Sequence, residues 1–262
     1  MKVVCTTCCY RGLPSDELTE TLQGAPQAGY RYIDVHFVTL SDDRDAAHAY
    51  GEEVRESCLA HSLEPVGIYC EGFGGRDAAH LEQQMQRIRR RISFAMGLGV
   101  DRVVGSGAHP RGDGPLANVI ACLHALEDTI TGTPIKIGVE PHAGSVIEQI
   151  SDYDAIFSEI DHPQICICPD IGHFHAAGVD VYRLLEQYPA RIYHTHIKDH
   201  RGRQSVGIGR GEIDISRFIR TLAQLGYDGC LAVELEHLDK EHTQQYVTEA
   251  RVRLEQELGS LG

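Results

Sequence analysis

The chain has 262 residues, of which 42% are hydrophobic and 24% are charged, and its formal net charge at pH 7 is −14. This acidic balance argues against non-specific binding to nucleic acid or to an anionic membrane surface. The sequence contains no run of about 18 apolar residues, which argues against a membrane-spanning helix. Nine cysteines, an odd number, are scattered along the chain, as is typical of a reducing compartment. We therefore expect a cytoplasmic protein that binds neither nucleic acid nor membrane.

The N-terminal segment MKVVCTTCCYRG predicts a first strand rather than a signal peptide. It has one early lysine, a short apolar run and no small-residue cleavage site. Its cysteines, Cys5, Cys8 and Cys9, invite a metal-site interpretation, but the chain has no second CxxC pair to complete a thiolate quartet. We expect them to be small apolar residues of the strand and its turn.

Strand-like apolar runs alternate with helical runs along the chain. The predicted strands lie near residues 2–8, 31–37, 65–70, 101–105, 135–140, 164–169, 191–197 and 230–235. The predicted helices lie near residues 15–29, 43–61, 77–98, 114–131, 145–160, 179–188, 214–225 and 239–257.

Eight strand–helix units predict a parallel sheet with right-handed crossovers, and eight is the number that closes a (β/α)8 barrel. A doubly wound open sheet is the alternative. Such a sheet usually has a glycine-rich phosphate loop after its first strand, whereas CCYRGLPSDE has no GxGxxG. We predict a single domain over residues 1–262.

Four acidic or imidazole residues end four successive strand-like runs. They are separated by 30, 26 and 38 residues, about one strand-plus-helix unit each, and are Glu140, Asp170, His196 and Glu234. The carboxyl ends of barrel strands gather at one face, where barrel enzymes keep their chemistry. Three carboxylates with one imidazole are donors that suit an ion of the Mn, Co or Mg type better than they suit a thiolate-type zinc site. We therefore expect these four residues to hold one divalent metal ion (Mn, Co, Mg or Zn).

Strand periodicity predicts that the acids point into the barrel. Alternate residues of a strand share a face, which pairs Gly138 with Glu140, Cys168 with Asp170, and Ala232 with Glu234. The large branched residues between them are then expected to face the helices. The alternative to metal binding is that the inward acids pair with inward bases, namely Lys136, His194 or Lys198.

The two glutamates are predicted to be the catalytic residues. A divalent ion would polarise a carbonyl and stabilise an enediolate. Because Glu140 and Glu234 come from different strands, one carboxylate is placed to remove a proton and the other to return it. The expected reaction is proton transfer α to a carbonyl in a small polyhydroxylated substrate.

Five segments resemble the sugar phosphate isomerase/epimerase superfamily, the xylose isomerase-like TIM barrels. They are VEPHAG (139–144), CPDIGH (168–173), HTHIKD (194–199), GIGRGEID (207–214) and LGYDGCLAVELE (225–236). The resemblance implies a divalent-metal-dependent sugar or sugar phosphate isomerase or epimerase, with the four strand-end residues as metal ligands. It implies that Glu140 and Glu234 double as the acid/base pair, as in the ketose 3-epimerases, and that His173 binds substrate. Barrels of this superfamily often self-associate, so a homo-oligomer is compatible with it.

The chain departs from the epimerase pattern at one arginine. In those epimerases an arginine follows the metal-binding histidine, but the matching position here is Gly202. Arg201 or Arg203 is predicted to replace it.

The same superfamily contains other activities. A dehydratase of an inosose-like or dehydroshikimate-like substrate would begin with the same proton abstraction and then expel hydroxide, and nothing in the residues separates the two. Apurinic endonucleases share a His-Pro after the fourth strand, present here as His109-Pro110, but they need an Asp-x-His that DHRGRQSVGIGRG lacks. A non-catalytic sugar-binding barrel is the remaining alternative.

Several other residues are candidates for contact with the substrate. His36 shares the inward face of its strand and is expected at the pocket rim, Glu71 closes the third strand, and Lys198 points inward near His196. If Lys198 does not bind substrate, it is expected to pair with Asp199 or a glutamate. The full set predicted to bind substrate is His36, Glu71, His109, His173, Lys198 and Arg201. Two further expectations concern surface features: a tight loop over the barrel mouth at 207–211, and a solvated helix face formed by Arg87, Arg89, Arg90 and Arg91.

Overall fold

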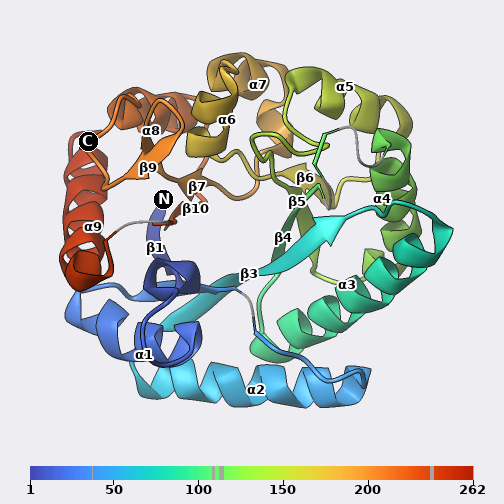
Figure 1. The fold of residues 1–262 in the computed structure, drawn as a ribbon, viewed down its shortest axis with the longest axis horizontal. Coiled ribbons are helices and arrows are strands. Elements are labelled where there is room, and N and C mark those ends of the chain that lie inside the picture. The colour runs from blue at the N-terminus through green and yellow to red at the C-terminus, as the bar shows by residue number, and fades with distance from the viewer. Residues whose placement is uncertain (37, 108–109, 112–114, 237–238, 262) are drawn as a thin grey trace.

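The computed structural model describes residues 1–36, 38–107, 110–111, 115–236 and 239–261. Within these residues, eight strands form one parallel sheet in the order β6-β5-β4-β3-β2-β1-β10-β7. Their bounds are β1 Lys2–Thr6, β2 Tyr32–Val35, β3 Glu64–Phe73, β4 Arg102–Gly107, β5 Lys136–Val139, β6 Ile165–Ile167, β7 His196–Ile197 and β10 Cys230–Val233. The two edges of the sheet meet through parallel bridges from Ile167 to Ile192 and from Asp170 to His196. The sheet therefore curls into a barrel (Figure 1).

Helices connect the strands and surround the barrel (Figure 1). Their bounds are α1 Glu17–Gln27, α2 Arg44–Ala60, α3 Ala78–Leu98, α4 Leu116–Ile130, α5 Ile150–Glu159, α6 Ile171–Ala177, α7 Val181–Gln187, α8 Ile215–Gln224 and α9 Thr243–Gly259. Short 3-10 helices lie at η1 Thr7–Tyr10, η2 Pro189–Arg191 and η3 Lys240–His242. Aspartate side chains cap the first backbone amides of several helices, as at Asp16, Asp77 and Asp214. No helix in the described part of the chain is both long and apolar enough to span a bilayer.

The (β/α)8 barrel predicted from the sequence is confirmed, with two additions. Helix α6 begins directly after Asp170, whose side chain accepts a hydrogen bond from the His173 amide. A two-stranded hairpin, β8 Asp199–Arg201 and β9 Gln204–Val206, follows β7. Both additions lie at the carboxyl ends of the strands and therefore shape the barrel mouth.

The predicted orientation of the strand residues is also confirmed. The branched residues of β5, β6 and β10 pack in the main hydrophobic core with residues of the surrounding helices. Inside the barrel lie two small apolar groups, one made of Val4, Val66, Cys230 and Ala232, and one of Tyr69, Val104 and Cys168. Cys168 and Ala232 are small, and each lies two residues before an acid, Asp170 or Glu234, on the same inward face of its strand.

Candidate metal centre

The four residues predicted as metal ligands lie together at the carboxyl ends of the strands. Glu140 follows β5, Asp170 follows β6, His196 begins β7 and Glu234 follows β10. One ligand atom from each lies within 4.8 Å of the others, and all four residues are buried. His196 Nδ1 contacts Glu140 Oε1 and lies 3.0 Å from Glu234 Oε2. The imidazole therefore faces both glutamates, as a shared ion would require.

The cluster contains buried polar atoms whose hydrogen-bonding capacity is not met. Among the described residues, Asp170 Oδ2, His196 Nε2 and Glu234 Oε2 have no hydrogen-bond partner. Lys198 Nζ lies 3.0 Å from Asp170 Oδ2 and 3.2 Å from Glu234 Oε2, but neither contact has the angles of a hydrogen bond. Buried polar atoms are normally satisfied, and a cation between the carboxylates would satisfy their oxygens. The donor set and its unsatisfied carboxylate oxygens therefore fit a divalent ion.

Charge within the cluster keeps the two glutamates ionised. Burial by itself would raise the pKa of both. The positive charge of His196 beside Glu140, and that of Lys198 beside Glu234, outweighs the effect of burial. Both glutamate pKa values therefore lie well below the usual range. Burial raises the pKa of Asp170, with Lys198 opposing it. A glutamate that stays ionised is competent both as a ligand and as a base.

Lys198 is the main counter-charge of the cluster. It is 1% exposed, and its ammonium lies 2.9 Å from Glu236 Oε2 in addition to its contacts with Asp170 and Glu234. Although burial opposes it, the carboxylates hold the pKa of Lys198 well above its usual value. Lys198 therefore pairs with glutamates, one of the two partners expected for it. Asp199, the other, accepts hydrogen bonds at 2.9 Å from the amides of Gly209 and Gly211 in the glycine loop.

Two histidines line the cluster beside Glu140 and Lys198. His142 Nε2 lies 2.8 Å from Glu140 Oε2, and His173 Nε2 lies 3.0 Å from Lys198 Nζ. Their ring centroids are 3.9 Å apart. Against the effect of burial, Glu140 raises the pKa of His142, whereas burial and Lys198 lower the pKa of His173. The adjacent rings thus differ in their tendency to carry a proton.

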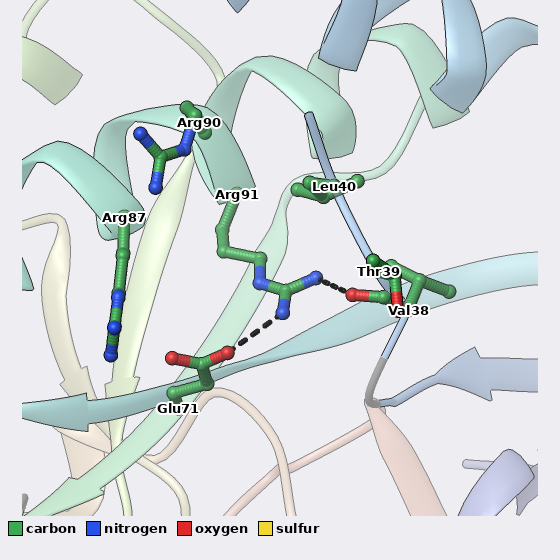
Figure 2. A pocket seen from close by; sticks show the side chains of 7 residues that line it. All are labelled: Val38, Thr39, Leu40, Glu71, Arg87, Arg90 and Arg91. Atoms are coloured by element: carbon green, nitrogen blue, oxygen red, sulfur yellow. Dashed lines mark hydrogen bonds and ion pairs between the residues drawn. The ribbon is translucent and has the colours of Figure 1, made fainter. Parts of the chain in front are cut away.

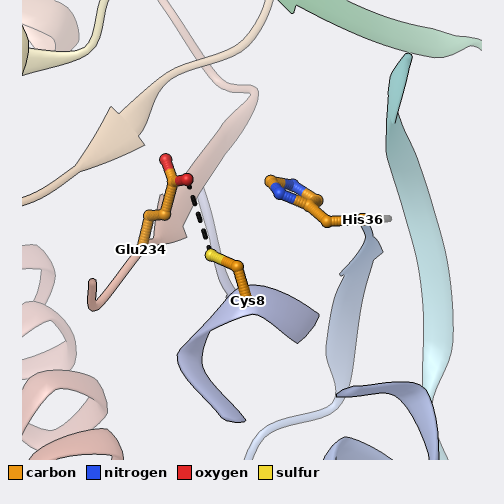
Figure 3. Close-up of side chains that lie close together, drawn as sticks. All are labelled: Cys8, His36 and Glu234. Carbon is orange, nitrogen blue, oxygen red and sulfur yellow. Dashed lines mark hydrogen bonds between the residues drawn. The ribbon is translucent and has the colours of Figure 1, made fainter. Parts of the chain in front are cut away.

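Cys8, in η1 after β1, and His36, after β2, lie close to Glu234 of the cluster (Figure 3). His36 is 2% exposed, so it lies deeper than the pocket rim expected for it, and burial lowers its pKa to about 4. Its ring centroid lies 5.2 Å from that of Tyr69 and 5.7 Å from that of His196. Cys8 Sγ, in η1, donates to Glu234 Oε1 at 3.5 Å. Cys8 thus has a polar role that the sequence did not predict.

The remaining candidates lie outside the cluster. Arg201 is exposed on β8, and its guanidinium donates to the Arg210 carbonyl at 2.9 Å. Glu71 lines a separate pocket of about 330 Å³ with Val38, Thr39, Leu40, Arg87, Arg90 and Arg91 (Figure 2). His109 lies outside the described residues.

One expectation about the arginines of α3 is wrong. Arg91 was expected on a solvated helix face, but it is only 8% exposed. Its guanidinium donates to the Val38 carbonyl and lies 2.8 Å from Glu71 Oε1. The segment that follows β2 covers this part of the helix, and the sequence period of α3 does not reveal such a cover.

Comparison with known proteins identifies the family. A sequence model of the family described as "Xylose isomerase-like TIM barrel" matches residues 22–256, and the chain belongs to this family. The inosose dehydratase of Lacticaseibacillus casei is 26% identical over 133 residues, which are 44% of this chain and 45% of that protein. The match thus spans less than half of the dehydratase.

One curated relative is similar over nearly the whole chain, and a solved structure is similar in fold. The L-ribulose-5-phosphate 3-epimerase UlaE of Salmonella typhimurium is 25% identical over 272 residues, covering 96% of this chain and 94% of the epimerase. The crystal structure of the IolI protein with a binding zinc atom superposes with a TM-score of 0.78 at 20% identity, covering 97% of this chain and 98% of the other. The structural likeness shows the shared fold.

Proposed function

We propose that this protein is a divalent-metal-dependent sugar (or sugar phosphate) isomerase or epimerase that moves a proton α to a carbonyl. The observation that carries the proposal is the buried set Glu140, Asp170, His196 and Glu234, with unsatisfied oxygens, at the carboxyl face of the barrel. Similarity to a 3-epimerase over nearly the whole chain supports it. So does the zinc carried by IolI, a protein of the same fold.

The four residues would hold the ion, which would serve as a Lewis acid toward the substrate carbonyl. The two glutamates follow strands β5 and β10, which are not neighbours in the sheet. Each has one oxygen directed at His196 and another directed elsewhere: Glu140 Oε2 toward His142 and Glu234 Oε1 toward Cys8. The second oxygens are the ones available to remove a proton from one side of the substrate and return it from the other.

The neighbouring cations and imidazoles assist this transfer. Lys198 remains protonated among its carboxylates, and its ammonium can donate to a substrate oxygen on which negative charge develops. His142 contacts Glu140 and so orients the carboxylate that carries the proton. His173, next to Lys198, presents a ring nitrogen for a substrate hydroxyl.

The test is solvent-deuterium exchange into a panel of ketoses, ketose phosphates and inososes with Mn, Co or Mg added. We expect deuterium at one α-carbon of a turned-over substrate and, with Mn or Mg, about one equivalent of metal per chain. Glu140→Gln and Glu234→Gln should each lower exchange by a factor of about 100 or more, because general acid–base catalysis contributes roughly that much.

The glutamine variants should keep the far-ultraviolet circular dichroism of the wild type, which separates loss of chemistry from loss of fold. Glu212→Gln is the control, since Glu212 is exposed on the surface beside His175 and outside the cluster. It should exchange at the wild-type rate. Wild-type exchange in either cluster variant would rule out the acid/base assignment.

A metal-dependent dehydratase of an inosose-like substrate is the second candidate. The partial match to an inosose dehydratase favours it, and Lys198 is a buried cation placed to assist a departing hydroxide. Product mass separates the two candidates, because only dehydration removes a molecule of water.

A further inference from the structure

Cys8, His36 and Glu234 form a second buried group that shares Glu234 with the proposed metal centre (Figure 3). Their ligand atoms lie within 4.8 Å of one another. The three residues come from η1, from the end of β2 and from the end of β10, and the strands β2, β1 and β10 are neighbours in the sheet. We call this group the thiol site.

We propose that the thiol site binds a second, thiophilic divalent ion such as Zn²⁺, and that this ion inhibits the enzyme. A thiolate, an imidazole and a carboxylate are the donors that zinc takes in proteins, with a fourth position left for water. Mg²⁺ and Mn²⁺ prefer oxygen donors and would not compete there. On binding, the Cys8 Sγ–H bond breaks, the sulfur bonds to the metal, and the proton leaves to solvent.

Inhibition follows from the way Glu234 divides its two oxygens. Oε2 lies 3.0 Å from His196 Nδ1 and 3.2 Å from Lys198 Nζ, on the side of the first centre. Oε1 lies 3.5 Å from Cys8 Sγ, on the other side. Under the proposed function Oε1 is the oxygen that exchanges the proton, so an ion held at the thiol site would occupy it. The inhibitory part of this inference rests on the proposed function, whereas the binding part does not.

Cobalt provides a test of binding that does not depend on activity. We expect the metal-free protein to bind two equivalents of Co²⁺, the second producing a near-ultraviolet thiolate-to-cobalt band. Cys8→Ser should keep one equivalent and lose the band, and Cys8→Ala should do the same if the serine variant does not fold. Cys9→Ser is the matched control, because Cys9 Sγ donates to the Val233 carbonyl rather than to a ligand. It should keep the band. A single equivalent in the wild type, or a band that persists without Cys8, would overturn the proposal.

Inhibition is measured on the Mn-loaded enzyme by adding excess Zn²⁺. Deuterium exchange should fall with Zn²⁺ but not with further Mn²⁺. With the exchange of each protein expressed relative to its own rate without zinc, the inhibitory Zn²⁺ concentration should be at least tenfold higher for Cys8→Ser than for the wild type. Equal zinc sensitivity in both proteins would refute the inhibitory role. If no ketose exchanges at all, the proposed function fails, and the cobalt titration still decides whether the thiol site exists.

Discussion

Asp34 and His194 form a buried ion-pair contact beside the candidate metal centre, with Oδ2 and Nε2 2.6 Å apart. Burial would raise the pKa of Asp34, but His194 outweighs it and lowers the pKa below its usual value. An aspartate with a depressed pKa stabilises the fold above its unfolded pKa of about 3.9 and loses that contribution as the pH falls through the folded value. Asp34→Asn should therefore lower the free energy of unfolding by about 2 kcal/mol near neutral pH.

Urea denaturation at a series of pH values measures this effect. The gap between wild type and Asp34→Asn should narrow as the pH falls below about 4, where the wild-type carboxylate takes up its proton. Asp42→Asn, at an exposed residue paired with Arg90, should change stability by less than about 0.5 kcal/mol. A gap that stays constant from neutral to acid pH would mean that the charge of Asp34 contributes nothing.

Single residues also show how far the sequence predicts the candidate site. The four proposed ligands were predicted because each ends a strand, and strand ends converge in a barrel. Glu236 lies two residues beyond Glu234 and contacts Lys198, so the same period of two could have found it. Cys8 could not be found in this way, because the turn of η1 and not a strand directs its thiol to Glu234.

Helices α2 and α3 pack closely enough for their backbones to touch. A Cβ atom at Gly97 would lie 2.0 Å from the His48 carbonyl oxygen, and one at Gly51 would lie 2.3 Å from that of Phe94. At an interior helix position, alanine is normally more stabilising than glycine by about 1 kcal/mol. At Gly97 the overlap is with backbone, which cannot turn aside, so Gly97→Ala should destabilise the protein by roughly 1–3 kcal/mol.

Thermal and urea unfolding of Gly97→Ala and Gly259→Ala provide the comparison. Gly259 is the last residue of α9, and a Cβ atom there would meet nothing within 4 Å. Its variant should match or slightly exceed the wild-type stability. If Gly97→Ala is as stable as the wild type, the two helices separate more easily than their packing indicates.

At the scale of elements, long periodic segments were predictable and short polar ones were not. Helix α3 repeats apolar residues over 21 residues, so its bounds were predicted closely. Helix α6 has 7 residues, too few for a period, and its N-cap is Asp170, a residue that also belongs to the candidate metal centre. The β8–β9 hairpin is polar and turns at Gly202, whose φ is +56°, without the alternation that marks a half-buried strand.

The barrel closes between β6 and β7, and this junction, the seam, is paired less extensively than that between β1 and β10. Strand β1 pairs with β10 over four residues, whereas in the described residues β6 and β7 are joined by the isolated bridges alone. Across this seam the Tyr193 amide donates to the Ile167 carbonyl at 3.2 Å and the His196 amide to the Pro169 carbonyl at 3.0 Å. Asp170 and His196 lie on opposite sides of it. Periodicity predicted the number of strands, but the weakest junction depends on strand lengths and could not be read from the sequence.

An ion held by Asp170 and His196 would therefore join the two edges of the barrel. At a concentration 100 times its dissociation constant, such an ion stabilises the fold by about 2.7 kcal/mol. The effect should concentrate at the seam, because local opening breaks the weakest contacts first. Removing the metal with a chelator should accelerate hydrogen exchange in a peptide containing Tyr193 and His196 more than in one containing β1. In Asp170→Asn the two peptides should no longer respond to metal. Equal acceleration in both peptides of the wild type would show that the ion stabilises the barrel globally rather than through its seam.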